Sequence, residues 1–204
     1  MKAAARATVG RPKEVADQQI LAVARRCFIQ RGSTIPAVEI ARELGVSHTT
    51  LFNRFGSKEG LLLAALGAPE HVPWVDALDA GPDARLIRDQ LIEHAVAMSA
   101  YFRDLQAGFA VLQAAGIDLG VACGRTDGPV RAFRAFVAWL ERARDQGGLA
   151  PCDAEVVAST ILSVLQGWAF TERVSGSTKR PAAGDQYVER FIDVLWQGIG
   201  PEER

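Results

Sequence analysis

The chain has 204 residues, of which 49% are hydrophobic and 23% are charged. This composition is typical of a soluble globular protein and excludes disorder over most of the length. At roughly 150 residues per domain, the length allows one domain or two small ones. The three cysteines, Cys27, Cys123 and Cys152, are widely spaced and odd in number, which argues against a disulfide framework or a CxxC metal site. We therefore expect a cytoplasmic protein without a metal or other cofactor.

The chain has no segment that we expect to cross a membrane. Its longest apolar stretch, Val156–Phe170, is interrupted by four polar residues and is shorter than the roughly 20 apolar residues that a bilayer requires. The basic N-terminal segment lacks the apolar core of a secretory signal.

Charge is distributed unevenly along the chain. Residues 1–67 hold ten Lys and Arg against five Asp and Glu, whereas residues 68–204 hold thirteen against nineteen. A basic first third joined to an acidic remainder indicates that only the first third approaches a polyanion.

Hydrophobic residues at three-and-four spacing predict an all-α protein, and the alternation typical of strands is absent. The first predicted helix, residues 14–31, has an apolar stripe that includes Ile20, Ala24 and Phe28, and Gly32 ends it. A short second helix is expected to begin at Pro36, as its first helical residue, and to end at Gly45. Ser47 is the expected N-cap of a third helix that ends near Phe55, and Ser57 that of a fourth that reaches residue 66.

Glycines and prolines punctuate residues 67–82, which predicts a junction with little order of its own. Longer helices are expected at residues 83–115, with a possible break near 103–108, and at 129–146, 153–174 and 184–198. Residues 116–128 and 175–183 are predicted loops.

The segment PAVEIARELGVSHTTLFNRF, Pro36 to Phe55, has the pattern of a helix-turn-helix. Two short helices that cross steeply need a small residue where they approach, and Ala41 supplies it. The tight turn needs a positive φ, which Gly45 adopts at low cost. The second helix is left with exposed hydroxyl, amide, imidazole and guanidinium groups, which suit the base edges and phosphates of DNA.

The run from about Ile20 to Leu66 resembles the DNA-binding domain of the TetR family of bacterial transcription regulators. The matching residues are ILAVARRCFIQRG in the first helix, then EIARELGVS, TLFNRF and SKEGLL. The resemblance implies a basic arm over residues 1–13, a three-helix helix-turn-helix domain over 14–67, and a helical effector-binding and dimerisation domain over 68–204. Phe52 stands where that family usually has Tyr.

The resemblance also implies which residues contact double-stranded DNA. His48, Thr49 and Asn53 would read base edges in the major groove. Thr50, Phe52, Arg54 and Lys58 would lie along the backbone, with Ser47 at the start of the reading helix, and Phe52 could equally cover the edge of the core. Lys58 also sits where the free N–H groups and positive end of a helix favour a phosphate. Arg6, Arg11 and Lys13 of the arm would follow the adjacent minor groove.

The resemblance implies a ligand cavity among the middle helices of the C-terminal part. Large aromatic residues there most often form plain core, so core packing remains the alternative for each candidate. If a cavity exists, it is expected to be aromatic and largely apolar, with Gln90, His94, Gln113 or Gln166 as polar anchors. The other candidate lining residues are Met98, Phe102, Phe109, Phe136, Trp139, Leu165 and Trp168.

The last two predicted helices are apolar over much of their circumference, and such helices need a second partner. Pairing with their symmetry copies would give a four-helix interface, which is also the family's arrangement. The candidate interface residues are Val157, Ile161, Val164, Gly167, Tyr187, Phe191 and Leu195. Such a dimer would place two reading helices roughly 34–36 Å apart and would require a palindromic operator.

The sequence therefore predicts a DNA-binding regulator, in the first instance a repressor that a small apolar or amphipathic effector releases. An alternative is a regulator controlled by a protein partner, which the absence of a cavity above about 300 Å³ would favour. An enzyme is not expected, because the chain has no GxSxG, HExxH, P-loop or GxGxxG motif.

Overall fold

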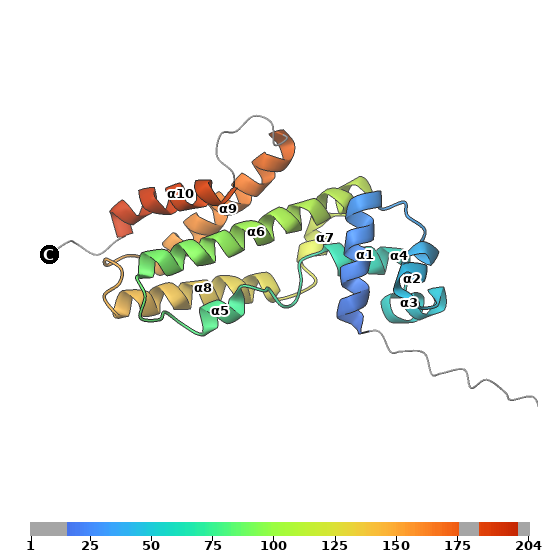
Figure 1. Ribbon diagram of the computed structural model, residues 1–204, viewed down its shortest axis with the longest axis horizontal. Helices are drawn as coiled ribbons and strands as arrows, with labels where there is room; N and C mark the ends of the chain where they lie inside the picture. Colours follow the sequence, from blue (N-terminus) through green and yellow to red (C-terminus); the bar gives the residue numbers. More distant parts are fainter. Residues whose placement is uncertain (1–15, 176–183, 200–204) are drawn as a thin grey trace, which may run out of the picture. The chain divides into compact units, whose positions relative to one another are not determined.

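The computed structural model describes residues 16–175 and 184–199, and its described part is helical without strands (Figure 1). The chain divides into two compact units, one up to Ala65 and one from Leu66 onward. The predicted basic arm, with Arg6, Arg11 and Lys13, lies outside the described residues. The first unit contains α1 (Asp17–Arg31), α2 (Ala37–Leu44), α3 (His48–Phe55) and α4 (Lys58–Leu66), the last of which ends one residue into the second unit.

The core of the N-terminal unit forms where α1, α2 and α3 meet. Apolar side chains at three-and-four spacing point inward, and the fully buried ones are Ile20, Ala24, Phe28, Ile40, Ala41 and Leu51. Gly45 ends α2 in the left-handed conformation, with φ 67° and ψ 25°. Because a Cβ is strained in that conformation, this glycine allows the tight turn that the sequence predicts.

The second helix begins one residue later than predicted. Pro36 is the N-cap of α2 and not its first helical residue, since its ψ of 134° is extended. A proline side chain offers no hydrogen-bond acceptor, so the start of α2 has no side-chain cap.

Polar contacts also hold α2 against α1. Arg26 and Arg31 of α1 form ion pairs with Glu43 and Glu39 of α2. The buried thiol of Cys27 donates to Glu43 Oε2 at 3.1 Å. The pKa of Cys27 is raised to about 11, mainly because the thiol is buried and secondly because of this hydrogen bond.

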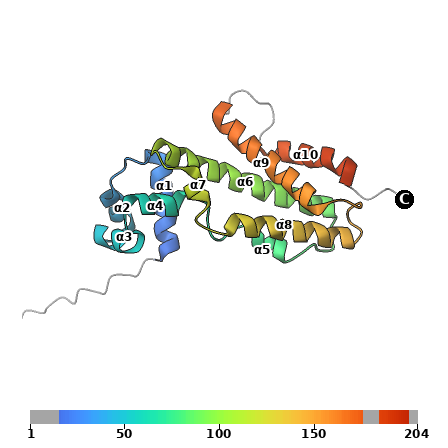
Figure 2. The same ribbon diagram turned by 180° about the vertical axis from the view of Figure 1, so that it is seen from behind.

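The C-terminal unit contains α5 (Val75–Asp79), α6 (Ile87–Ala114), α7 (Leu119–Cys123), α8 (Gly128–Asp145), α9 (Ala154–Ser175) and α10 (Gly184–Ile199). The long helix α6 packs against α9 and α10, and α8 packs against α9 and α5 (Figures 1 and 2). The fully buried Leu91, Met98, Phe136, Trp139 and Leu165 form the centre of this core.

Three features of the C-terminal unit differ from the prediction. Residues 67–82 are ordered by packing, because Val72, Trp74 and Leu78 are buried and α5 forms within the segment. Helix α6 runs for 28 residues without a break. A short helix, α7, lies inside the predicted loop 116–128, and Asp118 caps it by accepting a hydrogen bond from Val121 N. Glycines and prolines indicate turns and the ends of helices, but they do not reveal which neighbouring apolar residues become buried.

Helix α9 bears on the expectation that no segment crosses a membrane. By length and composition alone, residues 154–174 could cross a membrane, and this stretch is longer than Val156–Phe170. In the structure, one side of α9 packs on α6 and α8 through buried residues such as Ala158, Ile161 and Leu165. A core helix of a soluble protein passes the same test.

Candidate DNA-binding surface and effector cavity

Helix α3 starts with a complete side-chain cap. Ser47 Oγ accepts a hydrogen bond of 3.1 Å from Thr50 N, as predicted for the N-cap. The hydroxyls of Ser47 and Thr50 lie 2.8 Å apart and share a second hydrogen bond. This cap satisfies a free N–H group and sets where the helix begins.

One face of α3 points to solvent. His48, Thr49 and Asn53 are exposed, and their spacing of one and four residues places them on neighbouring turns. The rings of His48 and Phe52 meet edge to face, with centroids 4.2 Å apart. Phe52 is only half-buried, so it both supports the imidazole and remains partly exposed on this face.

Two cations, Arg54 and Lys58, follow these residues in the chain. Arg54 Nη1 donates to Asp17 Oδ1 of α1 at 2.8 Å, so its guanidinium is already engaged within the protein. Lys58 is the first residue of α4 and is half-exposed. The hydroxyl of Ser57 accepts from Gly60 N at 2.9 Å, which caps α4 as predicted.

Gly60 stands at a position that has no room for a side chain, and the sequence alone did not predict this. A Cβ at this residue would lie 2.1 Å from the carbonyl oxygen of Phe55. The absence of a side chain therefore allows α4 to start close against the end of α3.

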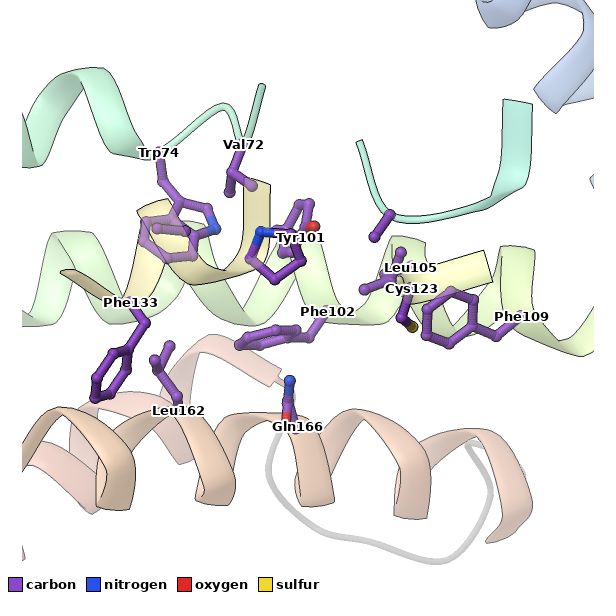
Figure 3. Close-up of a pocket in the computed structure, with 13 residues that line it drawn as sticks. Val72, Trp74, Tyr101, Phe102, Leu105, Phe109, Cys123, Phe133, Leu162 and Gln166 are labelled. Carbon is purple, nitrogen blue, oxygen red and sulfur yellow. The ribbon is translucent and has the colours of Figure 1, made fainter. Parts of the chain in front are cut away.

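A cavity of about 170 Å³ lies within the C-terminal unit (Figure 3). Aromatic and aliphatic side chains from α6, α8, α9 and the segment that follows α4 surround it. The lining residues are Ala68, Val72, Trp74, Tyr101, Phe102, Leu105, Phe109, Cys123, Pro129, Ala132, Phe133, Leu162 and Gln166.

Two of the ten candidate ligand residues, Phe102 and Phe109, line this cavity, as does Gln166. Trp74 and Tyr101 were missed. Trp74 falls in the segment expected to have little order, so nothing in its sequence neighbourhood marked it for burial. Gln166 extends from α9 toward the ring of Phe102 (Figure 3).

The other candidates lie elsewhere. Met98, Phe136, Trp139 and Leu165 are fully buried in the core, and Gln113 is exposed at the end of α6. For the four buried residues, the alternative of plain core packing is the one that the structure shows. Helix periodicity alone does not separate a cavity wall from a filled core.

The candidate polar anchors Gln90 and His94 have structural contacts. The Gln90 amide accepts from Asp83 N at 2.9 Å and donates to Arg85 O at 2.9 Å, which closes the turn before α6. The His94 ring meets Trp139 edge to face at 4.9 Å. Burial lowers the pKa of His94, so the neutral imidazole is favoured there.

A second hollow, of about 310 Å³, lies between α6 and α9. Its wall carries charge, from Arg103, Glu172 and Arg173, with Ala107 and Ala169 between them. Arg103 also pairs with Asp185 of α10 at 3.3 Å. In the described part of the chain, no group of three His, Cys, Asp or Glu side chains is arranged to hold a metal ion.

Helices α9 and α10 divide the candidate interface residues between two environments. Val157 and Ile161 are buried within the unit, so they face its own core and not a partner. Gly167 is exposed, and Val164, Tyr187, Phe191 and Leu195 are half-buried. Tyr187 stacks on Trp168, another candidate ligand residue, with ring centroids 3.6 Å apart.

The outward side of α9 instead carries an exposed stripe that we call the α9 stripe. Its members alternate four and three residues apart, which keeps them on one side of the helix. They are Val156, Thr160, Ser163, Gly167, Phe170 and Val174, and all are exposed.

Residues 20–65 match the model of the bacterial regulatory proteins of the tetR family. The chain carries the DNA-binding domain of the TetR family. The matched segment contains the capped α3 and its exposed face, so the match assigns helix-turn-helix DNA binding and transcription regulation to this domain.

Solved structures of transcriptional regulators share the fold. A putative TetR-family transcriptional regulator from Mesorhizobium loti MAFF303099 superposes with a TM-score of 0.71 at 19% identity, covering 90% of this chain and 96% of that one. A TetR transcriptional regulator from Streptomyces coelicolor gives 0.58 at 24% identity, covering 91% and 99%. A putative transcriptional regulator from Saccharomonospora viridis, solved in complex with choline, gives 0.64 at 21% identity, covering 91% and 97%. No curated protein matches the chain in sequence.

Proposed function

We propose that this protein is a cytoplasmic transcriptional repressor that binds a palindromic operator as a homodimer and is released by a small, largely apolar effector. The observation that carries the proposal is the capped α3, which presents His48, Thr49 and Asn53 to solvent within a TetR-family domain. Exposed amide and imidazole groups on a rigid helix can donate to and accept from base edges in the major groove.

The cations beside α3 would position the helix rather than read sequence. Lys58 at the start of α4 places its charge next to free backbone N–H groups, and both favour a phosphate. Arg54 is bound to Asp17, so its guanidinium would have to leave the Asp17 carboxylate to bind a phosphate. We therefore assign the larger backbone role to Lys58, with Thr50 and Phe52 at the edge of the contact. Arg6, Arg11 and Lys13 would add minor-groove contacts.

The α9 stripe supports the proposed homodimer. Val156, Phe170 and Val174 would bury apolar surface, and Thr160, Ser163 and Gly167 between them would let a second helix approach closely. The half-buried Tyr187, Phe191 and Leu195 would extend this surface onto α10. Val157 and Ile161 are left out of the interface, because both are buried within the protomer.

The cavity wall suggests how an effector would act on DNA binding. Ala68, Val72 and Trp74 line the cavity, and they belong to the segment that directly follows α4. Hydrogen bonds hold this segment within the C-terminal unit, among them Arg131 Nη2 to Glu70 O at 2.7 Å and Ala68 N to Ala122 O at 3.3 Å. An effector that moves the segment would favour a different spacing of the two reading helices, which is a shift between two populated states.

The size of the cavity keeps a second candidate function open. At about 170 Å³ the aromatic cavity is smaller than most drug-sized sites, which favours control by a protein partner. The charged hollow between α6 and α9 is larger, at about 310 Å³. The Saccharomonospora viridis regulator with choline favours a small effector, because it has this fold and was solved with a small molecule. We propose the small effector and treat the protein partner as the alternative.

Selection of duplexes from a random library would test DNA binding and its symmetry together. We expect palindromic sequences to be enriched and to bind the full-length protein as a dimer in sedimentation analysis. Affinity should fall steeply as salt rises, because each neutralised phosphate releases counterions. Enrichment of unrelated or non-palindromic duplexes would contradict the proposal.

Adding cell extract to the operator complex separates a small effector from a protein partner. A dialysable fraction that releases DNA supports the small effector, and a retained fraction that does so supports the protein partner.

A further inference from the structure

The volume of the cavity limits the size of what it can bind. At about 170 Å³ it is close to engineered cavities of ~150 Å³ that hold one benzene molecule. A single ring with a short substituent, on the order of ten non-hydrogen atoms, is therefore the largest compound that fits without expansion of the cavity.

The walls of the cavity indicate an uncharged compound. None of its lining residues is Asp, Glu, Lys, Arg or His. A charged ligand would lose its hydration there without gaining an ionic partner, which is costly in an apolar site. The rings of Tyr101, Phe102 and Phe133 instead offer faces and edges to another ring (Figure 3).

One hydrogen-bond donor in the wall has no acceptor. Trp74 is 6% exposed, and its Nε1 has no hydrogen-bond partner within the described part of the chain. Figure 3 places this nitrogen on the ring edge turned toward Tyr101, and the two rings meet edge to face with centroids 6.2 Å apart. A buried donor left unpaired is unfavourable, so an acceptor that reaches it gains more than an ordinary hydrogen bond would.

We propose that the cavity binds a small neutral ring compound with one hydrogen-bond acceptor, and that the indole N–H of Trp74 donates to this acceptor. The inference names the chemical class of the effector and rests on the proposed effector response. In the ligand-free cavity, Nε1 is covered by its neighbours, so the acceptor enters by parting the Trp74 and Tyr101 rings. Trp74 lies in the segment that directly follows α4, so a ligand bound to it acts on the part of the C-terminal unit that is nearest in sequence to the DNA-binding domain.

Two compounds of nearly the same shape test the hydrogen bond. Acetophenone carries a carbonyl oxygen where α-methylstyrene carries a CH2 group, so only acetophenone can accept from Trp74. Calorimetry on the full-length protein without DNA gives both Kd values, and their ratio cancels effects of cavity shape. Trp74→Phe should shift this ratio against acetophenone by about fivefold or more, the worth of one net hydrogen bond.

Trp139→Phe is the matched control. Trp139 Nε1 is also buried without a partner within the described residues, but this side chain does not line the cavity. The control should leave the Kd ratio within about twofold. In the ¹⁵N-labelled wild-type protein, acetophenone should move the indole proton of Trp74 downfield and α-methylstyrene should not, a measurement that holds even if Trp74→Phe folds poorly.

Three results would overturn the proposal. They are a Kd ratio unchanged by Trp74→Phe, tighter binding of benzoate or phenyltrimethylammonium than of acetophenone, and no binding of either neutral compound to the wild-type protein. None of these measurements uses DNA, so failure of this inference is distinct from failure of operator binding.

Discussion

Asp17, the first residue of α1, accepts a 2.8 Å hydrogen bond at Oδ1 from Arg54 Nη1, near the end of α3. The pair joins residues 37 positions apart and ties the proposed reading helix to the first helix. It also places a carboxylate beside a guanidinium that the resemblance to TetR-family proteins assigns to the DNA backbone. The Arg54 guanidinium therefore stabilises the fold in the free protein, and in the proposed DNA complex Asp17 and a phosphate would compete for it.

Asp17→Asn should tighten binding to every duplex while slightly lowering stability. The substitution releases Arg54 for phosphate and removes a negative charge near DNA. The side chain of Asp17 is 65% exposed, so the loss in unfolding free energy should be only about 0.2–1 kcal/mol. Gel shift and urea unfolding measure the two effects. Asp145→Asn, which removes a comparably exposed carboxylate in the C-terminal unit, should change neither DNA affinity nor its salt dependence. Unchanged or weaker DNA binding by Asp17→Asn would contradict the competition.

Lys58→Ala and Asn53→Ala should differ in kind. Loss of Lys58 should weaken binding to all sequences alike and reduce the slope of log affinity against log salt by about one. Loss of Asn53 or His48 should change the preference among operator variants by about 1–3 kcal/mol per altered base pair. Titrations of variant duplexes at several salt concentrations separate the effects, with Arg144→Ala as a control for charge in the C-terminal unit. Identical behaviour of the three variants would contradict the division between reading and positioning residues.

Phe170→Glu should convert the proposed dimer to monomers. Phe170 is 51% exposed on the α9 stripe, where a carboxylate would be buried against the partner without compensation. Val130→Glu is the matched control, because Val130 on α8 is also 51% exposed but lies off that stripe. Sedimentation equilibrium at micromolar concentration should find monomers for the first variant and dimers for the second. If both variants remain dimeric, the interface lies elsewhere.

Gly128→Ala should destabilise the C-terminal unit by about 1–3 kcal/mol. A Cβ at Gly128 would lie 2.2 Å from Pro69 O and 2.8 Å from Glu70 O, so α8 or the segment after α4 must shift. Gly198→Ala in α10 meets nothing within 4 Å and should be neutral or stabilising by up to about 1 kcal/mol. Thermal unfolding of the two variants checks this difference. Equal stability would mean that the close approach to Pro69 is not required.

Cys27 should be the least reactive of the three thiols toward a disulfide reagent at about pH 8. Burial and the hydrogen bond to Glu43 raise its pKa to about 11, which leaves little thiolate at that pH. Cys123 and Cys152 are less buried and should react first. Reactivity of Cys27 should increase as the pH approaches 11 or as the N-terminal unit unfolds. Stopped-flow traces of the wild type and Cys27→Ser identify the slow phase. Equal rates for all three thiols would exclude this protection.

The local features of the N-terminal unit were predictable because they depend on a few neighbouring residues. Gly45 marks a positive φ, Ser47 marks a helix start, and the motif around them has a known spacing. The all-α fold was likewise evident from three-and-four periodicity and is confirmed by the structure. The choice of His48, Thr49 and Asn53 as readers remains a prediction, although the structure does place them on one exposed face.

Tertiary packing decided what periodicity left open. Val156 and Val157 are adjacent and chemically alike, yet one is 60% exposed and the other 7%, because α6 and α8 cover only one side of α9. Trp74 lies among glycines and prolines that predict a loop, but helices distant in sequence surround it and make it a cavity wall. Residue type and spacing therefore specified the helices and the reading motif, since these depend on short-range backbone preferences. The separation of core, cavity and exposed stripe arose only when distant helices met and excluded water from some apolar surfaces but not others.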